Sequence, residues 1–300
     1  MASAKKRRTQ SKKKVAATSK SVEKAPELVE EPAGAVVTDD VNLMTDLPQP
    51  TKFDRLYSWN KWLAWIHALQ GIAVLVLSAN YLLPVSTSFI TPNPLATKTM
   101  TPASHHLFDL SVAWLVALAF FMAAIMHTLV ATVYRTRYEA EIKQGVNRLR
   151  WIQFGISGSL MAVAIGLLCG IYDFSTLLLV VALTLTTSLL GMVLEMRKKD
   201  ESSSVLYAVS GMAGVASWVV LVLYLVGANI FGEGHLPAFV YWLSASAVVL
   251  YGGFAVNFYL TRQKQGKWAD YIYAERMYML LSVAACTALA WQIFAGALKP

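Results

Sequence analysis

Hydrophobic residues form seven long runs along the chain, separated by shorter polar segments. Each run can cross a bilayer, because a membrane-spanning α-helix needs about 20 predominantly apolar residues. The pattern predicts an all-α membrane protein with transmembrane helices near residues 61–83, 109–134, 151–171, 175–196, 205–231, 236–260 and 277–297. The composition agrees, since 56% of the residues are hydrophobic, only 15% are charged and the mean hydropathy is +0.48.

Two of the polar connections have a recognisable character. The turn at residues 172–174 is very short and predicts a tight antiparallel pair of the third and fourth helices. Residues 84–108 form the longest connection between helices and are rich in Pro and Thr. Thr and Ser alternate there with apolar residues, which predicts a small β-hairpin lying on the membrane surface.

Residues 1–54 carry none of this hydrophobic pattern. The first 20 residues hold eight Lys or Arg and no acidic residue, which locates the net charge of +8, and residues 23–54 then turn acidic. Such a composition cannot bury a core, so we expect a disordered tail before a membrane domain at residues 55–300. The basic run is expected to contact anionic membrane lipid, and no nucleic-acid partner is expected, although KKRR would also suit a nuclear signal.

The basic residues between the helices predict the orientation of the bundle. Cytoplasmic loops of membrane proteins carry an excess of Lys and Arg. One side of the predicted bundle holds Lys98 and Lys299 alone. The other side, which includes the basic tail, holds Arg135, Arg137, Lys143, Arg148, Arg150, Arg197, Lys198, Lys199, Arg262, Lys264, Lys267 and Arg276. We therefore expect the N-terminus in the cytoplasm and the C-terminus outside.

Polar side chains at membrane depth are costly and are candidates for function. They are His67, His127, Gln153, Asn257 and Gln292. The alternative for each is a hydrogen bond that holds two helices together, which we favour for the last two. The histidines could move protons near neutral pH, but we expect no carboxylate at membrane depth to act as a relay and no metal ligand set.

The start of the third helix reads RLRWIQFGISGSLM, in which Arg150 and Gln153 share one face. The small residues that follow allow either close helix packing or room for a ligand; they are Gly155, Ser157, Gly158 and Ser159. Aromatic residues on this helix and on others could line an apolar pocket or be plain core. They are Trp151, Trp218, Trp242, Tyr251, Phe254, Phe258 and Trp291.

Several of these segments together resemble heliorhodopsins, the seven-helix retinal proteins of inverted topology. The resemblance rests on RWIQFGISGSLM, CGIYD, LPAFVY, GKWADYIYAERMYMLLS and ALAWQIFAGAL, and it covers residues 53–300. It implies a rhodopsin-like bundle with a retinal pocket, dimerisation, a sensory or regulatory role and no ion pumping. It also implies that His67 and His127, near Arg150, line a polar cavity on the cytoplasmic side.

The sequence departs from the family pattern at two positions. Cys286 stands where the family has the lysine that forms a Schiff base with retinal, and Gln153 stands where the family has the counterion glutamate. The paired loss is coherent, because a buried carboxylate without its cation is strongly destabilising. No other lysine is expected at membrane depth, so we expect no covalent cofactor and admit retinal only as a non-covalent ligand. Cys286 and Cys169 otherwise suit small hydrophobic side chains.

Three kinds of function remain open. The first is a non-photochemical signalling or scaffold protein of the plasma membrane, acting as a homodimer with a cytoplasmic protein partner. The second is a binding protein for non-covalent retinal, a carotenoid-derived molecule or a lipid, in a pocket formed by Ser157, Trp218, Tyr251, Phe254 and Trp291. The third is a passive channel or proton path. An enzyme is not expected, since no nucleophile–base pair or metal set can be assembled.

Overall fold

The fold is described from a computed structural model, which covers residues 51–95, 99–197, 204–232 and 236–300. The tail expected at residues 1–54 therefore lies outside the described residues, apart from its last four positions. Lys98, Lys198 and Lys199, which entered the prediction of orientation, also lie outside them.

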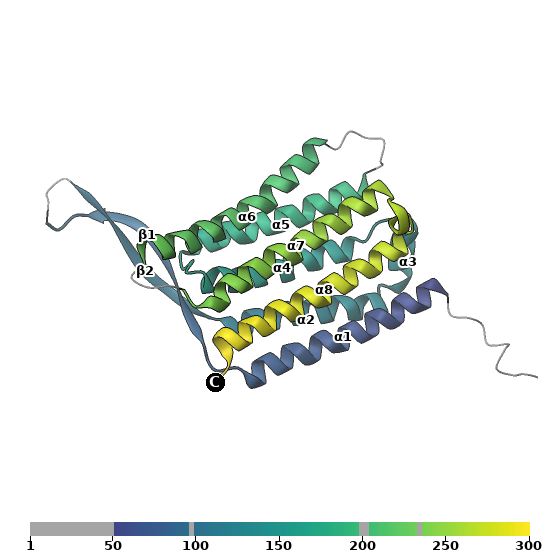
Figure 1. Ribbon diagram of the computed structural model, residues 1–300, viewed down its shortest axis with the longest axis horizontal. Helices are drawn as coiled ribbons and strands as arrows, with labels where there is room; N and C mark the ends of the chain where they lie inside the picture. The colour runs from purple at the N-terminus through teal and green to yellow at the C-terminus, as the bar shows by residue number, and fades with distance from the viewer. Residues whose placement is uncertain (1–50, 96–98, 198–203, 233–235) are drawn as a thin grey trace, which may run out of the picture. The chain divides into compact units, whose positions relative to one another are not determined.

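Seven helices of the described chain are long and apolar enough to cross a membrane, which confirms the predicted fold class (Figure 1). They are α1 (Lys52–Leu77), α2 (Val112–Ala131), α4 (Arg148–Leu168), α5 (Phe174–Met196), α6 (Ser204–Phe231), α7 (Ala238–Gln263) and α8 (Tyr271–Ile293). Three short elements complete the helical part, namely α3 (Arg135–Lys143), the 3-10 helix η1 (Gly266–Ala269) and the π-helix η2 (Phe294–Leu298).

The first and last membrane helices begin earlier than predicted. The first helix was expected near residues 61–83, but α1 begins at Lys52 because Thr51 and Asp54 form a capping box. It ends at Leu77, since the chain from Leu82 onward is a strand. The last helix begins at Tyr271 rather than near residue 277, because the Asp270 side chain caps it by accepting from the Ile272 amide. Hydrophobicity alone does not detect such polar first turns.

The predicted hairpin is present as β1 (Leu82–Pro92) and β2 (Met100–Ser111), which pair antiparallel. Its register shifts between Val85 and Ser86, where a bulge bends the ribbon. The Ser86 amide donates to the Tyr172 carbonyl over 2.8 Å, so the hairpin is tied to the turn between α4 and α5. Figure 1 shows the hairpin extending beyond the ends of the helices. Its position on a membrane surface stays a prediction.

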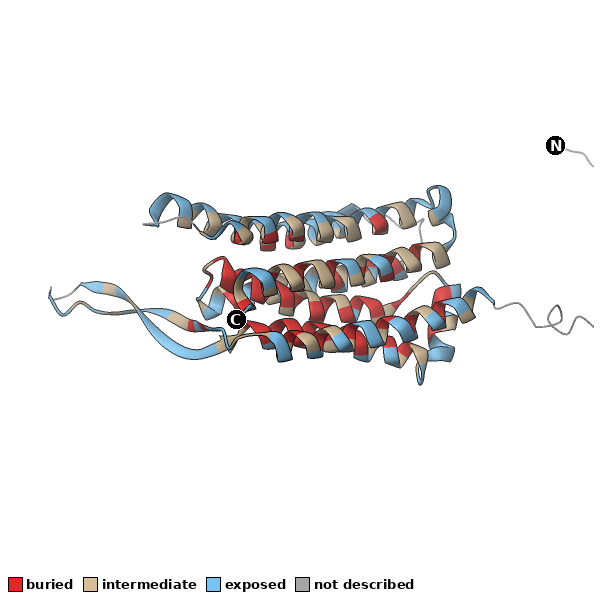
Figure 2. Cartoon of the chain, turned by 60° about the horizontal axis from the view of Figure 1, so that its bottom comes forward, coloured by how far each residue is buried: buried red, intermediate tan, exposed pale blue. Residues whose placement is uncertain are grey.

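Helix α4 lies at the centre of the bundle and packs against α2 and α5. In the 18-residue apolar stretch of α4, 72% of the residues are buried, whereas the corresponding share is 22% in α6 and in α7. Figure 2 shows the buried residues on the faces that the helices turn toward one another. A side chain on α4 is therefore the one best placed to meet several other helices.

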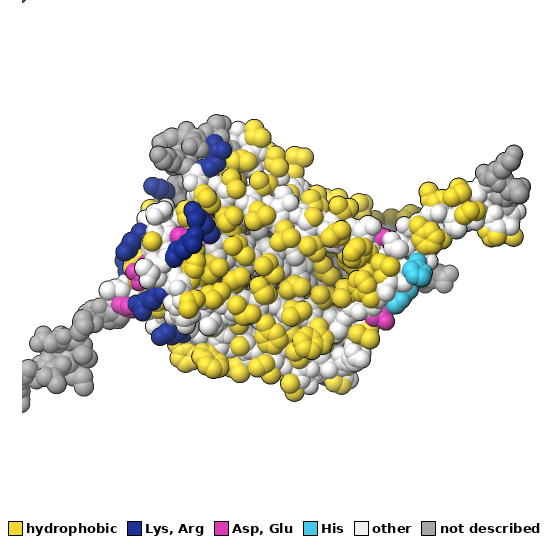
Figure 3. All heavy atoms as spheres, turned by 180° about the vertical axis from the view of Figure 1, so that it is seen from behind, with side chains coloured by type: hydrophobic (Ala, Val, Ile, Leu, Met, Phe, Trp, Pro, Cys, Tyr) yellow, Lys and Arg dark blue, Asp and Glu magenta, His cyan; other side chains and the backbone are white. Residues whose placement is uncertain are grey.

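The two ends of the bundle differ in charge (Figure 3). Lys and Arg side chains gather at the end that contains α3 and the first turns of α1, α4 and α8, which we name the basic end. The opposite end carries β1 and β2 and is named the hairpin end. Between them the surface is largely hydrophobic, as expected for helices that face lipid.

Candidate functional site

A buried ion-pair network lies at the basic end and joins α4, α5 and α8. The Arg150 guanidinium pairs with the carboxylates of Glu195 and Glu275, and all three side chains are at most 4% exposed. The guanidinium carbon also lies 3.8 Å from the ring centroid of Tyr278, a cation–π contact. We name Arg150, Glu195, Glu275 and their partner Asn147 the arginine cluster.

Neutral donors complete the arginine cluster. The Asn147 side chain caps α4 by accepting from the Arg150 amide, and its Nδ2 donates to Glu275 Oε1 over 2.7 Å. Trp151 Nε1 donates to Glu195 Oε2 over 2.7 Å. When both carboxylates are ionised, they carry two negative charges against the single positive charge of the guanidinium. The neutral donors stabilise the remaining negative charge by hydrogen bonding. The network therefore fixes the ends of three helices relative to one another.

Two histidines form a second buried polar group, between α1 and α2. The rings of His67 and His127 are stacked with centroids 5.5 Å apart and an interplanar angle of 3°. His127 Nδ1 lies 2.8 Å from Asn60 Oδ1, while Asn60 Nδ2 donates to the Leu56 carbonyl. This arrangement assigns the proton of a neutral His127 to Nδ1. Neither nitrogen of His67 has a hydrogen-bond partner among the described residues.

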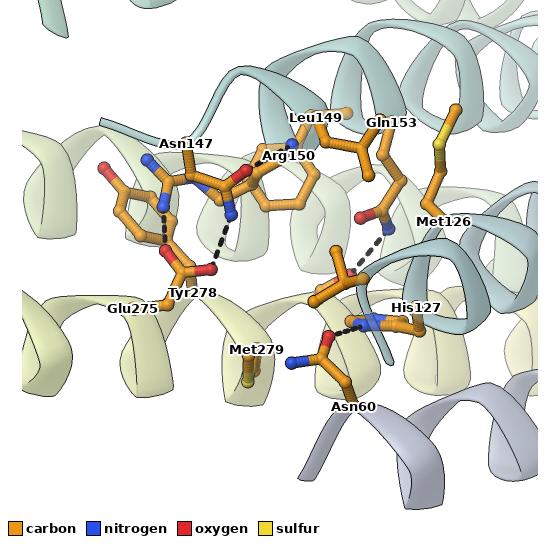
Figure 4. A pocket seen from close by; sticks show the side chains of 13 residues that line it. Asn60, Met126, His127, Asn147, Leu149, Arg150, Gln153, Glu275, Tyr278 and Met279 are labelled. Carbon is orange, nitrogen blue, oxygen red and sulfur yellow. Dashed lines mark hydrogen bonds and ion pairs between the residues drawn. The ribbon is translucent and has the colours of Figure 1, made fainter. Parts of the chain in front are cut away.

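A small cavity lies between the arginine cluster and the histidine pair (Figure 4). Its volume is about 20 Å³, which suits about one water molecule. The cavity is lined by His127, Arg150 and Gln153, whereas the ring of His67 stacks on His127 and does not line it. The polar cavity that the resemblance implies for His67, His127 and Arg150 stays a prediction. The cavity is lined by Asn60, Met126, His127, Val130, Asn147, Leu149, Arg150, Gln153, Phe154, Glu275, Tyr278, Met279 and Ser282.

Gln153 lies one turn further into the bundle than Arg150 and faces α8. Its Nε2 donates to Ser282 Oγ over 3.4 Å. Ser282 precedes Cys286 by one helical turn, so the two share a face of α8. Cys286 itself is partly buried and packs against the large hydrophobic core. One hydrogen bond therefore joins Gln153 to the face of α8 that carries Cys286, and the assignment of Gln153 and Cys286 to the counterion and Schiff-base positions stays a prediction.

Three of the five expected pocket residues lie together. Trp218 and Tyr251 make an edge-to-face contact with centroids 5.2 Å apart, and Tyr251 contacts Phe254 at 6.5 Å. The other two make contacts elsewhere in the bundle. Ser157 Oγ donates to the Ala119 carbonyl on α2, and Trp291 Nε1 donates to Gln70 Oε1 on α1. Their role in a pocket stays a prediction.

Two polar residues hold helices together as favoured from the sequence. Asn257 Nδ2 on α7 donates to the Ala274 carbonyl on α8 over 3.3 Å. Gln292 Nε2 on α8 donates to Ser246 Oγ on α7 over 3.1 Å. Gly155 on α4 also serves packing, because a Cβ there would meet Leu185 of α5 at 3.1 Å.

Two buried glutamates at the basic end were not identified from the sequence, and the expectation that no carboxylate at membrane depth acts as a relay stays a prediction. Glu195 and Glu275 lie within α5 and α8 and are buried. A signal was available, since Glu195 lies inside the apolar run predicted at residues 175–196. Their common partner could not be found from spacing, because Arg150 is 45 and 125 residues away along the chain.

Solved structures define the class of fold. The transmembrane domain of Salpingoeca rosetta rhodopsin phosphodiesterase is similar with a TM-score of 0.58, at 14% identity, over 81% of this chain and 83% of that one. The light-driven proton pump LR (Mac) from Leptosphaeria maculans is similar with a TM-score of 0.56, at 14% identity, over 83% of this chain and 96% of that one. At such low identity the likeness establishes a rhodopsin-like seven-helix fold alone.

The family follows from the sequence match. The family model described as Heliorhodopsin matches residues 56–298. The chain belongs to the heliorhodopsin family and is an integral, multi-pass membrane protein. No match was found among the curated proteins.

Proposed function

We propose that this heliorhodopsin-family protein forms no retinal Schiff base and works as a non-photochemical sensory or regulatory protein, neither a pump nor an enzyme. The observation that carries this proposal is the contact between Gln153 and Ser282, one turn before Cys286. In the resemblance, Gln153 on α4 stands at the counterion position and Cys286 on α8 stands at the position of the Schiff-base lysine. Here both side chains are uncharged.

The chemistry of the available side chains supports the same conclusion. A Schiff base requires a primary amine, which a thiol cannot replace. Every lysine that the structure describes is exposed, including Lys61 on α1. A glutamate at position 153 would be buried without a cation, whereas Gln153 keeps a hydrogen bond without a charge. The residues present therefore do not fit a covalently bound retinal.

We further propose that the basic end faces the cytoplasm of the plasma membrane. The charge asymmetry between the two ends supports this orientation. The N-terminus would then be cytoplasmic and the C-terminus extracellular, with the basic end available to a cytoplasmic protein partner. We also propose that the protein is a homodimer that contacts membrane lipid and has no nucleic-acid partner.

The test is an absorption spectrum of the purified protein after addition of all-trans retinal. We expect no visible band that hydroxylamine bleaches. A bleachable visible band would overturn the proposal. The matched variant restores the missing pair, Cys286→Lys with Gln153→Glu, and should form a pigment if the pocket between α4 and α8 has kept its shape. That variant also controls for retinal delivery.

A second candidate is a binding protein for a non-covalent ligand such as retinal, a carotenoid-derived molecule or a lipid. The contiguous aromatic side chains of Trp218, Tyr251 and Phe254 favour it, since flat apolar ligands stack on such surfaces. Solvent extraction followed by mass spectrometry tests it. A co-purifying ligand that is lost in Phe254→Ala would favour this candidate, and protein without any ligand would exclude it.

A further inference from the structure

A second hollow lies on the lipid-facing side of the bundle, between α7 and α8. It is a groove of about 330 Å³, which is within the range of small-molecule sites. Its walls are Gly253, Val256 and Leu260 on α7 and Leu280, Leu281 and Ala284 on α8. The groove opens on the hydrophobic surface between the basic end and the hairpin end, because Val256 and Leu280 are exposed there. Its occupant must therefore be apolar and reach it from the membrane.

The polar atoms at the floor of the groove are already satisfied. Asn257 is 4% exposed, and its Oδ1 accepts from Trp268 Nε1 over 2.6 Å while its Nδ2 donates to the Ala274 carbonyl. Asn257 and Trp268 both line the groove. Because these groups bond each other, the surface offered to an occupant is carbon, which suits an acyl chain.

Basic side chains stand next to the groove residues at the basic end. Lys264 follows Leu260 by four residues, and Lys267 directly precedes Trp268. Both lysines are exposed, and neither makes an ion pair among the described residues. The nearest acidic residue along the chain, Asp270, pairs with Lys52 of α1. The two lysines are therefore available to an anionic headgroup at the membrane surface.

We infer that the α7–α8 groove binds one anionic phospholipid, with an acyl chain between the helices and the phosphate at Lys264 and Lys267. Asn257 gives such a lipid a structural connection to the arginine cluster. Its amide bonds the carbonyl of Ala274, the residue directly before Glu275. A lipid in the groove would thus brace the first turns of α8, from which Glu275 reaches Arg150.

The experiment measures lipid binding to the full chain in detergent by native mass spectrometry. Dioleoyl phosphatidylglycerol is compared with dioleoyl phosphatidylcholine, which has the same acyl chains. We expect one phosphatidylglycerol per protomer to bind about tenfold or more tightly than phosphatidylcholine. Lys264→Gln with Lys267→Gln should abolish this preference, whereas Arg55→Gln with Lys143→Gln, also exposed at the basic end, should keep it.

The acyl chain is tested by filling the groove. Ala284→Phe should remove the bound lipid, whereas Ala255→Phe, on an exposed position of α7 outside the groove, should retain it. Leu280→Trp provides a second filling variant if Ala284→Phe fails to fold. Equal binding of the two lipids, or equal loss in the control variants, would overturn the inference. Conversion of a dimer into monomers by Ala284→Phe would also overturn it, since the groove would then be covered by a second copy.

Discussion

The two polar regions along α4 differ in how they treat charge. At the basic end, Arg150 is buried with two carboxylates, and every member of the arginine cluster has several partners. One turn deeper, Gln153 meets Ser282, and no charged side chain takes part in the bond. The comparison indicates that a buried charge is retained where its partners are present on neighbouring helices. Where the cation is absent, the carboxylate is absent too.

Removal of Arg150 should have the largest effect. Arg150→Ala leaves Glu195 and Glu275 buried without a cation, and loss of one partner of a buried ion pair typically costs about 3–5 kcal/mol. The midpoint of thermal unfolding in detergent should fall steeply. Arg55→Ala, at an exposed position of α1, is the control and should leave the midpoint unchanged. Equal midpoints for Arg150→Ala and wild type would show that the cluster contributes nothing to stability.

Introduction of a charge one turn deeper should be nearly as harmful. Gln153→Glu places an unpaired carboxylate in the uncharged region, at a cost of about 2–4 kcal/mol in the free energy of unfolding. Cys286→Lys combined with it should recover part of that loss. A double-mutant cycle of unfolding midpoints measures the coupling. Additive effects of the two substitutions would mean that the side chains at these positions do not meet.

A smaller effect is expected where Trp151 crosses α5. A Cβ at Gly191 would overlap the Trp151 ring, whose Nε1 donates to Glu195. Gly191→Ala should therefore displace the indole and cost about 1–3 kcal/mol. Gly211→Ala on α6, where nothing lies within 4 Å of the new Cβ, is the matched control and should not destabilise. Tryptophan fluorescence during unfolding follows both variants.

The histidine pair should respond unequally to the same substitution. His127→Phe removes the partner of Asn60 Oδ1, and an unsatisfied buried acceptor costs about 1–3 kcal/mol. His67→Phe removes no hydrogen bond among the described residues and should cost less. Thermal unfolding of both variants makes the comparison. A larger loss for His67→Phe would mean that its ring nitrogens are engaged in the membrane-embedded protein.

The smallest effect concerns the exposed pair of Lys52 and Asp270. The hydrogen bond from Lys52 Nζ holds the pKa of Asp270 below its usual range. A carboxyl group whose pKa is lowered in the folded state stabilises the fold at a pH above its unfolded-state pKa. This stabilisation is lost as the pH falls through the folded-state pKa. Lys52→Ala should thus cost about 0.2–1 kcal/mol at pH 7 and nothing at low pH. A cost that grows on acidification would contradict this assignment.

The helices could be predicted from sequence better than the site. Hydrophobic runs of about 20 residues mark membrane helices directly, and Pro and Thr with alternating apolar residues marked the hairpin. The start of α1 was missed because it depends on the Thr51–Asp54 capping box, which carries no hydrophobic signal. Helix α3 was missed for the same reason, since RTRYEAEIK has no apolar run.

The arginine cluster could not be predicted because it depends on contacts between distant segments. Arg150 was singled out for its position, but its ion-pair partners Glu195 and Glu275 were not identified from the sequence. Their burial follows from the packing of α4 against α5 and α8, which no local pattern encodes. Asn60 was missed similarly, because a single amide on α1 becomes informative when His127 lies 2.8 Å away.

One backbone contact bears on the order of assembly during synthesis. The Ala79 amide, just after α1, donates to the Leu298 carbonyl at the end of η2 over 2.7 Å, and Trp291 bonds Gln70 nearby. The Trp291–Gln70 bond joins residues 221 positions apart, so the end of α1 finds these partners only after α8 and η2 have been made. Until then, α1 is held mainly by its neighbour α2. Closure of the helix ring thus waits for the synthesis of α8 and η2, and a chain interrupted before them would leave this flank of α1 without its partners.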